Sequence, residues 1–143
     1  MRAEPRKKLA VVACMDARLD PAEVLGLELG DAHVIRNAGG VITEDEIRSL
    51  AISQHLLGTE EIVLIQHTDC GLLKINDEDF ARRLEEDSGE RPPWSAHAFD
   101  DLEDSLRDSI RRIKESPFVP RTDSVRGFVY EVETGRLREL DAQ

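Results

Sequence analysis

The residues of this chain best suited to binding a metal are two cysteines and one histidine. Cys14 ends the apolar run Leu9–Ala13, while His67 and Cys70 follow the apolar run Ile62–Ile65. A cysteine at a buried strand end is more often an inert apolar side chain than a ligand, so the inference depends on all three residues falling at such ends. Thiolate and neutral imidazole are favoured ligands of Zn²⁺, and three protein ligands leave the fourth tetrahedral position open. The pattern therefore predicts one catalytic zinc ion per chain.

Asp16 and Arg18 follow Cys14 directly. On an ordinary surface such a pair is solvated and stabilises the fold little. Beside a metal, the carboxylate can take the fourth ligand position, or a bidentate arginine can hold it away from the ion. The guanidinium also keeps the carboxylate ionised. We therefore predict that Asp16 and Arg18 are catalytic, and that Asp16 is also an alternative ligand of the metal.

These side chains can meet only if their strands are neighbours in one sheet. Apolar strand-like runs alternate with helical segments along residues 1–143, which predicts a single, doubly wound α/β domain. Its mainly parallel central sheet is flanked by helices and finished by a C-terminal antiparallel edge hairpin. In such sheets, sites form at the carboxyl ends of the strands, beside a topological switch point. The expected strands are Leu9–Cys14, His33–Arg36, Ile62–Ile65, Gly127–Val132 and Leu137–Leu140, and the expected helices are Pro21–Leu29, a segment between the Thr43 cap and Gly58, Asp77–Asp87 and Phe99–Ile113.

Composition excludes several classes of partner. The formal net charge of -11 argues against a nucleic-acid or anionic-membrane surface, because both require clustered Lys and Arg. No apolar run approaches the roughly 20 residues of a membrane span. The apolar run after the basic start is too short for a secretory signal, so we expect a cytoplasmic protein. Two cysteines in a reducing compartment favour metal binding, catalysis or plain burial over a disulfide.

Three short motifs follow the first three expected strands in order: C-x-D-x-R at Cys14–Arg18, R-N-A-G-G at Arg36–Gly40 and H-T-D-C-G at His67–Gly71. Together they resemble the β-class carbonic anhydrases, in particular the short single-domain members, and the resemblance extends from Leu9 to about Leu140. It implies zinc ligands at Cys14, His67 and Cys70, with Asp16 and Arg18 as a dyad that gates the fourth position. It also implies reversible hydration of carbon dioxide to bicarbonate and a proton by zinc-bound hydroxide, in homodimers or larger even-numbered homo-oligomers.

Other functions remain open at this point. The same zinc site would serve a hydrolase acting on carbon disulfide or carbonyl sulfide. Permanent ligation by Asp16 would instead give a closed, non-catalytic zinc or bicarbonate-sensing domain. A thiol phosphatase is disfavoured, because Cys14 and Arg18 are too close in sequence to frame a phosphate-cradling loop.

The remaining polar and glycine residues near the motifs are expected to support the site, with one candidate for proton transfer. Asp69 is expected to cap a helix that begins near Gly71, with the orientation of a metal ligand as the alternative. Gly39 and Gly40 are expected to allow positive φ or a close backbone approach near the metal. Among the other histidines, His97 is the best candidate for a proton shuttle, because imidazole titrates near neutral pH. Arg36 and Asn37 are expected to brace the turn between them and the helix that follows.

Overall fold

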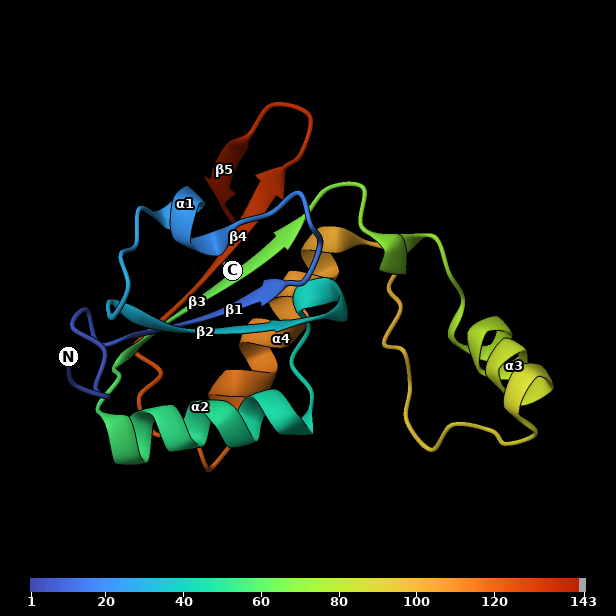
Figure 1. The fold of residues 1–143 in the computed structure, drawn as a ribbon, viewed down its shortest axis with the longest axis horizontal. Coiled ribbons are helices and arrows are strands. Elements are labelled where there is room, and N and C mark those ends of the chain that lie inside the picture. Colours follow the sequence, from blue (N-terminus) through green and yellow to red (C-terminus); the bar gives the residue numbers. More distant parts are fainter. Residues whose placement is uncertain (142–143) are drawn as a thin grey trace.

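A five-stranded sheet forms the centre of the molecule (Figure 1). The computed structural model describes residues 1–141. The strand order is β2-β1-β3-β4-β5, and the first four strands are parallel while β5 is antiparallel to β4. This confirms the predicted mixed α/β sheet with an antiparallel edge. The strands are β1 (Leu9–Cys14), β2 (Ala32–Asn37), β3 (Glu61–His67), β4 (Ser124–Glu131) and β5 (Arg136–Glu139).

Apolar side chains cover both faces of the central strands. Because successive side chains point to opposite faces, Ala10 and Val12 of β1 enter one core while Val11 and Ala13 enter the other. Helices α2 (Glu44–Leu57) and α4 (Leu102–Glu115) supply apolar side chains to the first core. The short α1 (Pro21–Leu25) and the residues after it cover the second core. Burial on both faces explains why β1 and β3 read as continuous apolar runs.

Helix ends agree with the sequence where a capping signal is strong. The capping box of Thr43 and Glu46 starts α2, and Gly58 ends it in the left-handed conformation. The first helix is shorter than predicted, because Gly26, with φ of 67°, ends it at Leu25. The predicted start of α4 at Phe99 is also wrong, since the Asp101 side chain caps a helix that begins at Leu102, three residues later.

Residues 74–98, which we call the arm, project beyond the end of the sheet (Figure 1). The arm carries α3 (Asp77–Ser88), as predicted, followed by a segment without regular structure. No residue of α3 is buried. The Asp77 carboxylate accepts hydrogen bonds from the Ala98 amide at 2.8 Å and the Ser95 hydroxyl at 3.3 Å, which closes the base of the arm. None of the helices within residues 1–141 is both long and apolar enough to cross a bilayer.

Candidate metal centre

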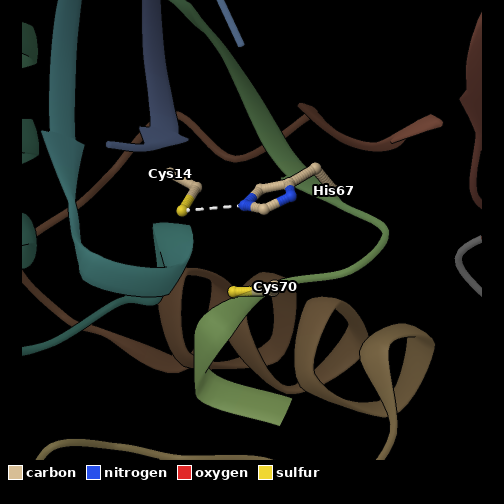
Figure 2. Close-up of side chains that lie close together, drawn as sticks. All are labelled: Cys14, His67 and Cys70. Carbon is tan, nitrogen blue, oxygen red and sulfur yellow. Dashed lines mark hydrogen bonds between the residues drawn. The ribbon is translucent and has the colours of Figure 1, made fainter. Parts of the chain in front are cut away.

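Cys14, His67 and Cys70 converge at the carboxyl edge of the sheet (Figure 2). Cys14 is the last residue of β1, and His67 is the last residue of the adjacent β3. The chain turns after His67 and brings Cys70 back toward the other two side chains. The strand order changes direction between β1 and β3, so this is the switch point at which sites are expected. The sequence prediction that these three residues meet is confirmed.

The three donor atoms lie within 4.8 Å of one another, and all three residues are buried. The Nε2 atom of His67 is 3.1 Å from the Sγ atom of Cys14. The Nδ1 atom of His67 is 2.7 Å from the main-chain oxygen of Thr68. Because a carbonyl oxygen can only accept, Nδ1 carries a proton, and Nε2 faces the Cys14 sulfur and would be the atom that binds a metal. This is how metal-binding histidines are commonly oriented.

The pKa values of the Cys14 and Cys70 thiols are shifted in opposite directions. A hydrogen bond from the Cys70 thiol lowers the pKa of Cys14 to about 4, although burial acts in the opposite direction. The same hydrogen bond, together with burial, raises the pKa of Cys70. Burial also disfavours a charged His67, but its contacts with Cys14 and Thr68 outweigh that effect and raise the pKa of His67. The cluster therefore keeps Cys14 as a thiolate and retains a proton on Cys70 that a cation would displace.

This donor set fits zinc. Ligand atoms at about 2.1–2.3 Å from a tetrahedral ion lie roughly 3.4–3.8 Å apart. The three donor atoms here lie within 4.8 Å of one another, so small side-chain movements would bring them to these distances. Two thiolates and one imidazole match the softness of Zn²⁺ and offset its charge in a buried place. Three donors from the chain leave one position open. Cys14, His67 and Cys70 would therefore hold the ion.

Backbone contacts hold the Cys14 end of the site. Gly39 and Gly40 have φ of 88° and 64°, as predicted, and a Cβ atom on Gly40 would lie 2.8 Å from the Cys14 nitrogen. Arg36 donates hydrogen bonds to the carbonyl oxygens of Cys14, Asp16 and Leu19 at 2.7–3.1 Å. Arg36 therefore braces the loop after β1 and not, as predicted, the turn that follows Arg36 itself; within that turn it is Asn37 that donates, to the Val41 carbonyl at 2.7 Å.

Asp16 lies beside the metal-binding group but points to Arg18. Its Oδ1 and Oδ2 atoms accept hydrogen bonds from the Arg18 Nε and Nη2 atoms at 2.9 Å and 2.8 Å. Its Oδ2 atom is 3.7 Å from the Nε2 atom of His67. The hydrogen bonds from the Arg18 side chain and amide hold the pKa of Asp16 well below its usual range. The carboxylate is therefore ionised, adjacent to the site, and held by the bidentate arginine.

The predicted capping role of Asp69 is wrong. Residues Gly71–Leu73 form only a single 3₁₀ turn, whose N-cap is Cys70 without a side-chain hydrogen bond. Asp69 instead forms ion pairs with Arg18 at 3.0 Å and with Lys74 at 2.7 Å. The Lys74 and Arg18 hydrogen bonds lower the pKa of the Asp69 carboxyl. These pairs could not be predicted from local sequence patterns, since Arg18 and Asp69 lie 51 positions apart.

The other histidines lie away from the three donors. His33 contacts the Ser53 hydroxyl at 2.7 Å, and His55 contacts the Phe118 carbonyl at 3.2 Å. His97 lines a cavity of about 320 Å³ that also borders Ala38 and Leu72, near the Cys14 and Cys70 ends of the site. A proton-shuttle role for His97 stays a prediction.

Gln66, beside His67, is a buried polar residue that the sequence analysis missed. Its side chain is completely buried, and its Nε2 atom donates to the Ser105 hydroxyl at 3.2 Å. Its Oε1 atom has no hydrogen-bond partner among residues 1–141. Gln66 follows an apolar run directly, and nothing in this position indicates that its side chain is buried.

Comparison with known proteins identifies the family. A family model described as carbonic anhydrase matches residues 9–89. The chain is 55% identical to β-carbonic anhydrase 1 of Mycobacterium tuberculosis over 136 residues, which cover 95% of this chain and 83% of the relative. The chain belongs to the β-class carbonic anhydrases. This confirms the resemblance inferred from the three motifs.

Other members of this carbonic anhydrase family share the fold. The crystal structure of a carbonic anhydrase from Streptococcus mutans superposes with a TM-score of 0.91 at 45% identity, covering 96% of this chain and 84% of that chain. A carbon disulfide hydrolase from Acidithiobacillus thiooxidans is 35% identical over 153 residues, covering 92% of this chain and 76% of the relative. The family scaffold thus also carries hydrolysis of a second small, linear molecule in a relative.

Proposed function

We propose that this β-class carbonic anhydrase binds one zinc ion per chain through Cys14, His67 and Cys70 and catalyses the reversible hydration of carbon dioxide. The observation that carries the proposal is the convergence of three buried soft donors, with an ionised carboxylate directly beside them. When bound, zinc supplies a Lewis acid that makes water a nucleophile near neutral pH. Carbon dioxide and bicarbonate are the substrate pair, with no nucleic-acid or membrane partner.

The chain's own residues would orient the reactants. The Thr68 carbonyl fixes the His67 ring through Nδ1, so that Nε2 faces the other donors. Asp16 would accept a hydrogen bond from the attacking water and turn its lone pair toward the carbon atom of carbon dioxide. Arg18 keeps Asp16 ionised and in place. Asp16 would also exchange between Arg18 and the fourth ligand position, which closes the site while Asp16 occupies it.

Zinc content and stopped-flow hydration of carbon dioxide, measured from neutral to alkaline pH, test the proposal. We expect about one zinc per chain after purification without added metal, and activity that rises with pH. His67→Ala should lose both zinc and hydration, whereas the matched control His55→Ala, on the exposed part of α2, should keep both. Stoichiometric iron in place of zinc, or full zinc content in His67→Ala, would refute the assignment.

The carbon disulfide hydrolase relative supports a second candidate activity, hydrolysis of carbon disulfide. Release of hydrogen sulfide from carbon disulfide by the same zinc-loaded protein measures it. We expect hydration of carbon dioxide to dominate, because the 55% identical relative is a carbonic anhydrase. Faster hydrolysis of carbon disulfide than hydration of carbon dioxide would reverse this order.

We further propose that the working unit is a homodimer or a larger even-numbered assembly, which rests on the family resemblance, and that the protein is cytoplasmic. Light scattering at low micromolar concentration should give at least twice the chain mass. A stable and active monomer would refute the assembly. Fractionation of the source cells, with the chain recovered outside the cytoplasm, would refute the location.

A further inference from the structure

Arg18 contacts a second carboxylate in addition to that of Asp16. Its Nη1 atom donates to the Asp69 Oδ2 atom at 3.0 Å, and its Nη2 atom donates to the Asp69 main-chain oxygen at 3.1 Å. Asp16 meanwhile occupies Nε and the other side of Nη2. The two aspartates therefore hold different edges of one planar guanidinium, which presents its donors as a fixed fork. Through this contact, the loop after β1 is tied to the loop after β3.

The backbone conformation of Asp69 and an ion pair with Lys74 both support this contact. Asp69 has φ of 56°, a left-handed conformation that aspartate and asparagine tolerate better than other non-glycine residues. The Lys74 Nζ atom lies 2.7 Å from the Asp69 Oδ1 atom, the oxygen that Arg18 does not use. Lys74, Asp69, Arg18 and Asp16 thus form a row of alternating charges that ends beside His67.

We propose that Asp69, itself held by Lys74, is a positioning residue that fixes Arg18 from the side that Asp16 does not use. The inference rests on the proposed function in one respect, the exchange of Asp16 between Arg18 and the metal. When Asp16 leaves, the guanidinium keeps its two hydrogen bonds to Asp69, so Asp16 returns to an arginine that has not moved. Asp69 also competes with Asp16 for Arg18, and Lys74 weakens that competition by sharing the Asp69 charge.

The order of the Arg18 side chain tests the first part. The zinc-loaded protein, labelled with ¹⁵N-arginine, gives an Nε–Hε signal for Arg18 that disappears in Arg18→Lys. We expect this signal to stay rigid in Asp69→Gly, where Asp16 still holds Arg18, and in Asp16→Ala, where Asp69 does. In the combined variant the order parameter should fall from roughly 0.85 to below about 0.6. Glycine is chosen because it removes the carboxylate and accepts the positive φ. If Asp16→Ala does not fold, Asp16→Asn replaces it.

Zinc affinity tests the competition. The zinc dissociation constant is measured at neutral pH against a chelating dye. Asp69→Asn should leave Asp16 more tightly on Arg18 and raise the constant about two- to fivefold, the range expected for one half-exposed ion pair. Lys74→Met should free Asp69 to hold Arg18 and lower the constant by a similar factor. Asp87→Asn and Lys114→Met are matched charge controls at exposed positions of α3 and α4 and should leave it unchanged.

If the charges of Asp69 and Lys74 acted directly on the bound zinc, and not through Arg18 and Asp16, the two substitutions would change the zinc dissociation constant in the same directions as predicted above. The two substitutions are therefore repeated in an Asp16→Ala background, where an effect transmitted through Asp16 must disappear and a direct field must remain. Persistence of the full shifts in that background would overturn the inference, as would an Arg18 signal that is already mobile in Asp16→Ala alone or still rigid in the combined variant. Failure of the proposed function would instead appear as absent zinc or absent hydration in the unsubstituted chain.

Discussion

Gly40→Ala should damage the site through the main chain rather than through a ligand. The Gly40 backbone passes directly over the ends of β1 and β3. A Cβ atom on this residue would lie 2.8 Å from the Cys14 nitrogen and 2.9 Å from the Ile65 oxygen. Real Cβ contacts are not this short, and both neighbours are backbone atoms of the central sheet. The extra methyl group must therefore push apart the strands that carry Cys14 and His67.

The expected cost has two sources. The positive φ of 64° at Gly40 costs an L-residue about 1–2 kcal/mol. Overpacking against fixed backbone adds about 1–3 kcal/mol. The sum, about 2–5 kcal/mol, is a large part of the total stability of a domain of this size. Gly26→Ala separates the two sources, because Gly26 has φ of 67° but no atom within 4 Å of the added Cβ.

Urea unfolding of both variants measures the difference, and chelator competition reports zinc affinity. Gly40→Ala should lower the free energy of unfolding by about 1–3 kcal/mol more than Gly26→Ala does, the share assigned to overpacking. It should also weaken zinc binding, whereas Gly26→Ala should leave zinc binding unchanged. Equal losses of stability in the two variants would show that the backbone contact costs nothing and would refute the reasoning.

Three further substitutions test contacts around the sheet. Arg36→Lys cannot reach the carbonyls of Cys14, Asp16 and Leu19 together, so urea unfolding should show a loss of about 1–2 kcal/mol, and unchanged stability would contradict the bracing role. Gln54→Ala removes both hydrogen bonds to the Arg121 backbone, and the same assay should show a loss of about 2–4 kcal/mol. The Glu28 amide and Arg6 lower the pKa of Asp31, so its stabilisation is present above the unfolded pKa of about 3.9 and is lost as pH falls. Asp31→Asn should therefore lower stability at pH 7, and its difference from the unsubstituted chain should shrink as pH falls below about 3.9, as measured by thermal unfolding.

The metal-binding group could be predicted from the sequence because its position follows from topology. Cys14 and His67 end two apolar runs, and parallel strands bring such ends to one edge. The spacing of His67 and Cys70 then requires only one turn of chain. The capping box of α2 could be predicted equally well, because the two residues that form it are only three positions apart in the sequence.

The role of Asp69 could not be predicted, because it depends on a long-range contact and on one backbone angle. The acidic residue before Cys70 looked like a helix cap, but the left-handed φ turns its carboxylate toward Arg18. The early end of α1 at Gly26 shows a related difficulty. Either of two glycines, Gly26 or Gly30, could have ended that helix, and the pattern of apolar residues did not show that Gly26 takes the left-handed conformation.

The exposed arm divides the molecule into parts with different local stability. Helix α3 buries no residue, so it is held by its Asn76 cap, by the ion pair of Glu78 with Arg91 and by the contacts of Asp77 at the base of the arm. A 12-residue helix held only by surface contacts is marginal in water, so we expect its amide hydrogens to exchange before those of the central strands. The cavity that reaches Ala38 and Leu72 has Phe80 and Trp94 of the arm on its outer side. We therefore expect this wall of the cavity to open at a lower free energy than the sheet edge that holds Cys14 and His67.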